Sequence, residues 1–377
     1  PAEKRVFGCY RFGAFGSTGV KLEGVAGKDG LRAGYRGLFQ CSSVWACPSC
    51  AALIGAGRAG ELKAAVARHL AMSGKIMLLT LTTRHTRAER LGELLSAFRA
   101  AQRSFKQGRA WKALNADLLG SVTATEATWS TRNGWHPHLH VLLFLEGGGV
   151  PDAAKLTEAW LGALRKQGLD GVSGVALDLQ DGEAAASYLA KWGIDKEMAR
   201  GDAKHGGGAG FAPFEILRAS HLAGLSVEER AAWGCLFVEY YRAFKGKKQL
   251  TWSQGLKVAL GVGEVEDEEI VGSEVVEAEK AGRVVFALRI PFPIWLALVA
   301  LRAEVAVLGL VESGRFDDVH SLFERVAGLV VENTRRGVRY NWAGKLVPMG
   351  DREMLFDYCF IKSQENQKKP MDGVFEA

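Results

Sequence analysis

The sequence predicts an α+β protein in which an antiparallel sheet is covered by helices. Segments with strand character and segments with helical periodicity alternate over the first two thirds of the chain. Two of the expected strands, 120–129 and 135–145, are separated only by the turn-forming sequence STRNG, which makes them partners in a hairpin. Because hairpin partners run antiparallel, the alternation of helices and strands does not describe a purely parallel sheet.

The other elements follow from hydrophobic periodicity and from the turn residues between them. Apolar residues spaced three and four apart predict a helix, whereas a short apolar run bounded by turn residues predicts a strand. Helices are expected over 51–71, 87–105, 153–167 and 182–193, and further strands over 75–83 and 174–180. This order places helices between the strands and so over the faces of the sheet.

The longest apolar run, 291–311, predicts a buried helix rather than a membrane span. It contains Arg302 and Glu304, whereas a helix that crosses a bilayer needs about 20 residues almost free of charge. The N-terminal sequence PAEKRVFG has no apolar signal core. We therefore expect a cytoplasmic protein with no membrane partner.

Charge is distributed unevenly along the 377 residues, whose formal net charge is +6. Residues 1–257 hold 34 Lys and Arg against 22 Asp and Glu, a net of +12, and the remainder holds 14 against 20, a net of −6. A basic region joined to an acidic one suggests that only the first binds a polyanion such as nucleic acid. Unevenly solvated faces are the alternative explanation.

Three histidines at alternate positions of the returning strand are candidate metal ligands. Side chains at positions i and i+2 of a strand share a face, so His136, His138 and His140 point the same way. Pro137 suggests a strand start or an edge position, which makes His136 the weakest candidate. Two imidazoles one pleat apart can bind one divalent ion.

A third ligand is expected from the preceding strand, where Glu126 is the candidate. A two-residue turn at 133–134 would pair Glu126 with position 141 and put the carboxylate on the wrong face. A three-residue loop over 132–134, with Gly134 in the left-handed conformation, would pair Glu126 with His140 and place Thr128 opposite His138. We expect the second register, because the first leaves an acidic side chain alone in an apolar setting.

The segment AAASYLAKW provides a candidate nucleophile. Tyr188 and Lys191 are three residues apart on the expected helix and share a face. A phenol with a pKa of about 10 is a poor nucleophile at neutral pH, and a nearby ammonium or a metal-bound phosphate would favour its attack. An amphipathic helix with a lysine at its surface has the same pattern.

Four cysteines near the N-terminus suggest a second metal site. Cys47 and Cys50 form a C-x-x-C pair, with Cys41 six residues earlier and Cys9 more distant. Four thiolates would complete a closed structural zinc site, whereas disulfides are rare in a cytoplasmic chain. Reduced, buried cysteines are the alternative.

The stretch 240–252, YYRAFKGKKQLTW, predicts a surface for single-stranded nucleic acid. It interleaves cations with aromatic residues, and cations suit phosphates as aromatic planes suit unpaired bases. The candidate contacts are Arg242, Lys245, Lys247, Lys248 and Trp252. A solvated helix end with aromatic residues in the core would give the same pattern.

Five motifs in order resemble the rolling-circle plasmid replication initiators of the HUH endonuclease superfamily. They are CSSVWACPSC, LLTLTTRH, TEATW…NGWHPHLHVLL, YLAKW and FAPFEIL…YYRAFKGKKQLTWSQGLK, within residues 9–257. The resemblance implies a ferredoxin-like core of the RNA-recognition-motif type. It also implies binding to single- and double-stranded plasmid origin DNA. A host helicase and a second copy of the chain are further candidate partners.

The resemblance implies roles for individual residues. His138 and His140 match the family's metal-binding histidines, and Glu126 matches its acidic position, in sites that hold Mg²⁺ or Mn²⁺. Tyr188 matches the single tyrosine that attacks a phosphodiester of single-stranded DNA, which gives a 5′-phosphotyrosine link and a free 3′-hydroxyl. Lys191 matches a lysine that contacts the scissile phosphate or the phenolate.

The termination step that religates the strand is less clearly encoded. Two-tyrosine relatives carry a second tyrosine where this chain has Trp192. Some single-tyrosine relatives carry a glutamate at the position of Ala184, and Glu183 lies about 140° from Tyr188 around an ideal helix. A transposase or a relaxase of the same superfamily is an alternative. So is a zinc-dependent DNA-binding regulator without nuclease activity.

Composition and motifs together predict the domain boundaries. The acidic, glycine-bounded segment 263–282 lacks aromatic residues and reads as a linker. We expect a zinc-knuckle and DNA-binding element at 1–70, an endonuclease domain with a basic extension at 71–260, an acidic linker at 261–282 and a separate, mainly helical accessory domain at 283–377.

Overall fold

The computed structural model divides the chain into two compact units. One unit combines Pro1–Cys41 with Val271–Ala377, and the other is Ser42–Ile270. The residues that the structure describes are 2–27, 30–147, 149–182, 210–271, 283–341 and 345–349. The helix expected over 182–193, with Tyr188 and Lys191, therefore lies outside the described residues.

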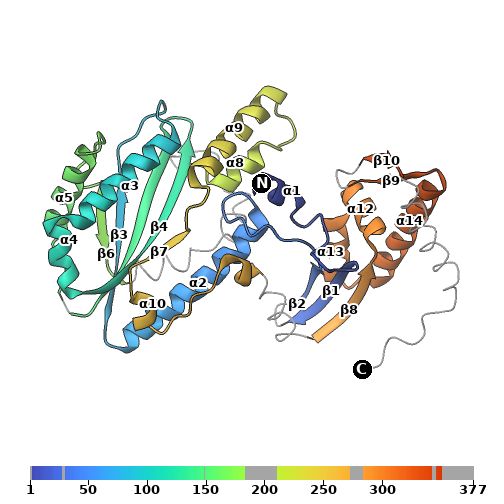
Figure 1. Ribbon diagram of the computed structural model, residues 1–377, viewed down its shortest axis with the longest axis horizontal. Coiled ribbons are helices and arrows are strands. Elements are labelled where there is room, and N and C mark those ends of the chain that lie inside the picture. Colours follow the sequence, from blue (N-terminus) through green and yellow to red (C-terminus); the bar gives the residue numbers. More distant parts are fainter. Residues whose placement is uncertain are drawn as a thin grey trace. The chain divides into compact units, whose positions relative to one another are not determined.

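The unit Ser42–Ile270 is built on a five-stranded sheet in the order β6-β3-β5-β4-β7, in which every neighbouring pair is antiparallel (Figure 1). The strands are β3 (Lys75–Thr82), β4 (Leu118–Ser130), β5 (Gly134–Leu145), β6 (Leu177–Gln180) and β7 (Leu250–Trp252). The expected α+β arrangement with an antiparallel sheet is confirmed.

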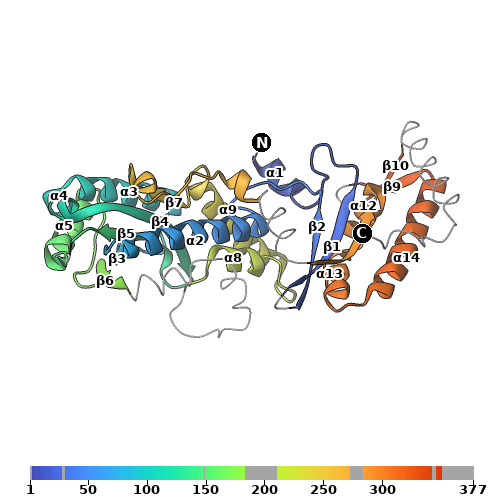
Figure 2. The same ribbon diagram turned by 90° about the horizontal axis from the view of Figure 1, so that it is seen from below.

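Helices cover both faces of this sheet (Figures 1 and 2). On one face, α3 (Leu91–Gln107), α4 (Arg109–Leu114) and α5 (Ala153–Arg165) pack on the odd-numbered residues of β3 and β5. On the other, α2 (Pro48–Ala71) and α10 (Leu256–Ala259) pack on even-numbered residues such as Leu78, Leu142 and Phe144. A short 3₁₀ turn, Asn115–Asp117, leads into β4.

The second face of the sheet is apolar only along part of its length. Its apolar side chains lie where α2 and α10 cover the sheet, whereas Glu126, His138 and His140 lie further along the same face. The strand pattern of alternating residues thus separates a packed half of this face from a polar half. The polar half carries the candidate metal site.

The β4–β5 hairpin differs in register from the expected one. Ser130 pairs with Gly134, so the loop is 131–133, and Gly134 is indeed left-handed with φ of +74°. Glu126 consequently lies opposite His138 rather than His140, and Thr128 lies opposite His136. Because the predicted register is wrong by two residues, an even number, the carboxylate still lies on the same face as the histidines.

Two arginines of α2 bind other parts of the same unit. Arg58 donates to Asp267 at 2.6 Å and to Glu61 at 2.8 Å. Arg68 donates to the carbonyl of Leu260 at 2.8 Å. These bonds attach the segment that follows β7 to α2.

Two further helices complete this unit, α8 (Pro213–Ala219) and α9 (Val227–Phe244). Phe211, just before α8, pairs with Trp129 of β4 in an isolated bridge and contacts Trp233 of α9, with ring centroids 5.0 Å apart. Aromatic packing therefore connects the chain after residue 210 to the turn end of the β4–β5 hairpin, beside the loop 131–133.

The other unit joins the two ends of the chain. Its sheet has the order β2-β1-β8, with β1 (Val20–Gly27), β2 (Gly30–Arg36) and β8 (Arg283–Ile290). The remaining elements are α1 (Ala2–Gly8), α12 (Phe292–Ala300), α13 (Glu304–Glu312), α14 (Phe316–Arg335), β9 (Val338–Tyr340) and β10 (Leu346–Pro348). Leu22 of β1 and Trp295 of α12 belong to one core cluster.

This partition differs from the domains drawn on the sequence. The sequence predicts that residues 1–41 belong to one domain with 42–70 and that 283–377 form a separate domain. In the structure, β1 pairs with β2 and with β8, so residues 1–41 belong with the C-terminal part of the chain. The cause is the sheet itself, because β1 is its central strand and needs a partner on each side.

The sequence predicts one helix over the apolar run 291–311, but the structure has two, α12 and α13. Arg302 adopts φ of +55°, and α12 and α13 meet at a bend of 102°. A left-handed residue ends a helix because the next residues cannot continue the i to i−4 bonding. Among the described residues, no single helix is long and apolar enough to cross a membrane. Taken together, α12 and α13 have the length and the composition of a membrane span, but the pair is bent.

Candidate functional site

Three side chains on the polar half of the central strands form a group with metal-ligand character. Glu126 comes from β4, and His138 and His140 come from β5. Oε2 of Glu126 lies 3.1 Å from Nε2 of His138 and 3.8 Å from Nε2 of His140. One ligand atom from each of the three lies within 4.8 Å of the other two. The structure thus brings together the three ligands expected from the sequence.

Neighbouring oxygen atoms orient both imidazole rings. Nδ1 of His140 lies 3.1 Å from Oγ1 of Thr80 in β3, and Nδ1 of His138 lies 3.4 Å from the carbonyl oxygen of His136. With these Nδ1 contacts, the Nε2 atoms of both rings lie toward the Glu126 carboxylate. Sequence analysis missed Thr80, although the alternation in LTLTT puts it on the histidine face.

Burial favours the neutral form of the His136 and His140 rings, the form that binds a metal ion. Burial lowers the pKa of His140 to about 4, and the neighbouring His138 adds to this, although Glu126 opposes it. Burial likewise lowers the pKa of His136 to about 4, followed by His138 and His85. At neutral pH, His140 therefore offers an uncharged nitrogen donor.

His136 lies on the same face but outside the ligand group. Its ring stacks on His85, with centroids 4.7 Å apart and planes 15° from parallel. His85, which follows β3, thus lies beside the histidine row. Stacking occupies one face of the His136 ring, which agrees with its rank as the weakest of the three ligand candidates.

The donor set suits a divalent ion with open coordination positions. Two imidazole nitrogens and one carboxylate oxygen leave positions free on an octahedral ion such as Mn²⁺ or Mg²⁺. The Glu126 side chain is 38% exposed, so an incoming ligand can reach the group from solvent. The residues present therefore fit a divalent ion that also binds a substrate oxygen.

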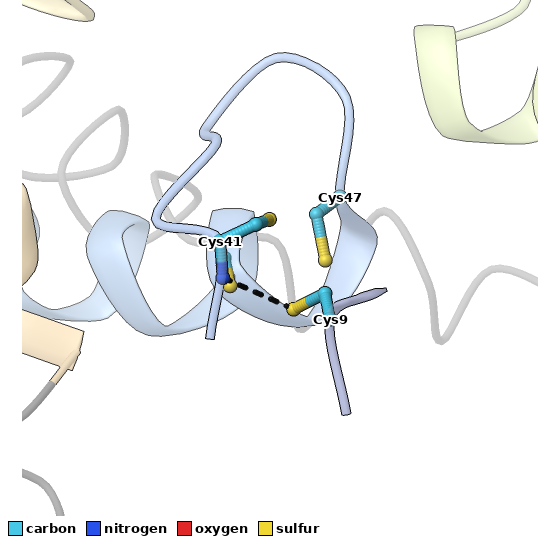
Figure 3. A group of neighbouring side chains, drawn as sticks. Cys9, Cys41 and Cys47 are labelled. Atoms are coloured by element: carbon cyan, nitrogen blue, oxygen red, sulfur yellow. Dashed lines mark hydrogen bonds between the residues drawn. The ribbon is translucent and has the colours of Figure 1, made fainter. Parts of the chain in front are cut away.

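Four cysteines form a second group of candidate ligands (Figure 3). Cys47 precedes α2 and Cys50 lies in its first turn, so the C-x-x-C pair spans the start of the helix. The backbone N–H of Cys41 donates to the sulfur of Cys9 at 3.3 Å. The four sulfur atoms all lie within 4.8 Å of one another, and none of these cysteines forms a disulfide.

The cysteine geometry fits a tetrahedral zinc ion. Zn–S bonds of about 2.3 Å place the sulfur atoms of such a site about 3.8 Å apart. The N-terminus of a helix, here free of acidic residues in its first turn, favours thiolates over thiols. Zinc is therefore the ion that we expect, and Cys9, which comes from a distant segment, is the ligand that the spacing alone least supports.

Metal analysis of the purified protein should find about one zinc per chain, and chelation should lower its melting temperature, because structural zinc contributes folding free energy. Cys47→Ser should destabilise the protein more than Cys235→Ser, which alters an exposed cysteine outside the group. Zinc-free protein of unchanged stability would show that the cysteines are simply reduced side chains.

The residues expected to bind DNA lie at the end of α9 and just beyond it. Arg242, Lys245, Lys247 and Lys248 are exposed. The intervening aromatic rings of Tyr241 and Phe244 are buried, and Phe244 packs on Trp45 with centroids 4.7 Å apart. The half-buried Trp252 has Lys257 over its ring at 5.2 Å. The cations are thus available to phosphates, while Tyr241 and Phe244 are in the core.

The fold and this site define an α+β protein with a histidine–carboxylate metal group on the central strands of an antiparallel sheet. Residues 39–156 of the chain match the family described as "Replication protein". That segment contains Glu126, His138 and His140, the C-x-x-C pair and Cys41, and it ends before Tyr188.

Three relatives are similar to parts of the chain. "Protein rep" of Streptomyces lividans is 29% identical over 304 residues, covering 62% of this chain and 67% of the relative. "Neomycin resistance protein" of Streptomyces cyanogenus is 30% identical over 137 residues, covering 29% and 31%. "Protein rep" of Lactiplantibacillus plantarum is 32% identical over 103 residues, covering 26% and 32%. No solved structure matches the chain.

These matches confirm that the chain resembles the Rep replication initiators. Their extent differs, because the aligned part of the chain spans about a third of the length of the last two relatives.

Proposed function

We propose that the protein initiates rolling-circle replication by nicking single-stranded origin DNA. The observation that carries the proposal is the group of Glu126, His138 and His140 inside the segment that matches the replication protein family. A group of two imidazoles and one carboxylate that is open to solvent suits a metal ion that must also bind a phosphate oxygen.

The proposed reaction is a transesterification. The phenolic oxygen of Tyr188 attacks the phosphorus atom of one phosphodiester, the bond from phosphorus to the 3′-oxygen breaks, and that oxygen takes up a proton. The products are a 5′-phosphotyrosine link and a free 3′-hydroxyl, which primes synthesis. Reversal of this chemistry by a new 3′-hydroxyl would rejoin the strand at termination. Lys191 would stabilise the phenolate or the scissile phosphate.

A bound Mn²⁺ or Mg²⁺ would polarise a non-bridging oxygen of the scissile phosphate. Glu126, His138 and His140 would hold the ion, and Thr80 would keep the His140 ring in place. This arrangement is that of the single-tyrosine type within the HUH superfamily. A transposase or relaxase of that superfamily would use the same chemistry on different DNA.

The cysteine group favours a second candidate, a zinc-dependent DNA-binding regulator that does not cut DNA. It would need Cys9, Cys41, Cys47 and Cys50 and the exposed cations near α9, but neither Tyr188 nor the histidine group. Two imidazoles around one carboxylate have no role in such a regulator, so we prefer the nuclease.

One assay distinguishes the two candidates. Purified full-length protein is incubated with single-stranded origin DNA and Mn²⁺, and denaturing electrophoresis is used to look for a protein–DNA adduct. The nuclease predicts an adduct that depends on Mn²⁺ and disappears with excess chelator. A protein that binds this DNA without forming an adduct would be the regulator.

A further inference from the structure

A group of cations on α3 faces β4, and none of them has an acidic partner among the residues that the structure describes. Arg99, Arg103 and Lys106 are spaced by four and three residues, so they share one side of the helix. Nζ of Lys106 lies 3.3 Å from Oγ1 of Thr123 in β4 and 5.0 Å from the ring centroid of Trp111. Lys106 therefore lies between a hydroxyl and an aromatic face.

The neighbours of these cations hold them in place but do not neutralise them. Arg99 donates to the amide oxygen of Gln102 at 3.2 Å, and the partners of Lys106 are likewise uncharged. Within the described part of the chain, no carboxylate forms an ion pair with Arg99, Arg103 or Lys106; the charges that act on Lys106 and Arg99 are those of other cations. The side chains of Arg99 and Lys106 are only partly exposed.

This arrangement costs folding free energy. Burial, with Arg99 as the second cause, lowers the pKa of Lys106 to about 8, and burial followed by Arg103 lowers the pKa of Arg99. A cation taken out of water without a carboxylate is destabilising. The helix dipole favours a cation at Lys106, in the last turn of α3, but not at Arg99, in its middle. An anion from outside the chain would remove the cost.

The group lies on the opposite side of the sheet from the candidate metal site. Thr123 and Glu126 are an odd number of residues apart on β4, so their side chains point to opposite faces. Thr123 pairs with Thr251 of β7, the edge strand, and Thr251 is exposed. A ligand can therefore reach this face at the edge of the sheet.

We propose that Arg99 and Lys106, with Thr123 holding the lysine, form a phosphate-binding site for the DNA backbone on the α3 face of the sheet. A guanidinium binds two oxygens of one phosphate, and an ammonium binds an oxygen of the same or a neighbouring phosphate. Contacts of this kind position DNA and do not read its sequence. The proposal rests on the proposed function only in that the protein acts on DNA.

The test compares Lys106→Met with Lys166→Met, which removes an exposed lysine of the same unit. Binding of the full-length protein to oligo(dT) and to a short duplex is measured over a range of salt concentrations. For Lys106→Met, the slope of log affinity against log salt should become shallower by about one, the change for one lost phosphate contact. Whichever DNA form shows the change is the source of the phosphate. Lys166→Met should leave the slope unchanged.

Thermal unfolding provides a second readout that a structural lysine would not give. Lys106→Met removes a partly buried, unneutralised cation, so its melting temperature should rise while its DNA affinity falls. Lys106→Arg should have the salt slope of the wild type. Arg99→Met should also show a shallower salt slope and a higher melting temperature, and it replaces Lys106→Met if that variant does not fold. Unchanged slopes on both DNA forms in Lys106→Met and Arg99→Met would overturn the proposal. The proposal would also be overturned if poly-glutamate raised the melting temperature of the wild type alone, because that result would indicate an acidic protein partner.

These outcomes are independent of the nicking chemistry. The salt slope measures binding alone and needs neither Tyr188 nor the histidine group. Wild-type protein that forms no adduct would contradict the proposed function and still allow the salt slopes to be compared.

Discussion

Replacing His138 or His140 with alanine is expected to abolish DNA cleavage while the melting temperature stays within a few degrees of the wild type. Each histidine provides one nitrogen to a group that has only three donors. Loss of a residue that merely orients a ligand costs about 10–100-fold in metal affinity or activity, so loss of a ligand should cost more. Both rings are partly exposed and lie outside the apolar clusters of the sheet, so little packing is lost.

The matched control is His136→Ala. It removes an imidazole from the same strand and the same face, but this ring stacks on His85 and is not in the ligand group. It should keep most of the cleavage activity. Cleavage is measured on labelled single-stranded origin DNA with Mn²⁺, and Mn²⁺ binding is measured separately by titration. Normal cleavage by both His138→Ala and His140→Ala would mean that these histidines are structural.

The side of the sheet that carries the site was predictable, but the register was not. Parity alone puts Glu126, His138 and His140 on one face, and any shift by an even number of residues preserves this. The loop length decides which residues are opposite, and STRNG is compatible with several loops. The structure closes the hairpin at Ser130 and Gly134, which brings Glu126 opposite His138.

Long-range pairing is the part of the fold that local patterns do not encode. β1 pairs with β8 more than 250 residues away in the sequence, and neither strand carries a signal for the other. The bend at Arg302 is similar, because its left-handed backbone is usual for glycine rather than arginine. Thr80 joins the site for the same reason, since it becomes a neighbour of His140 only when β3 pairs with β5.

Tyr188 remains the candidate nucleophile, although it lies outside the described residues. The structure bears on its two competitors, Tyr240 and Tyr241, which are 5% and 8% exposed in α9. The Tyr240 ring packs on Phe244, with centroids 4.7 Å apart, and lies parallel to Trp135. Side chains packed in this way would have to leave the core to reach a phosphodiester. Their burial supports the choice of Tyr188.

Tyr188→Phe is expected to remove covalent attachment to DNA completely while folding and DNA affinity persist. The substitution deletes the attacking oxygen and little volume. The measurement is adduct formation with single-stranded origin DNA and Mn²⁺, followed by peptide mapping of the wild-type adduct, which should place the nucleotide within AAASYLAK. Tyr241→Phe is the control and should still form the adduct. An adduct on Tyr240 or Tyr241, or a Tyr188→Phe variant that still links to DNA, would assign the attack to another residue.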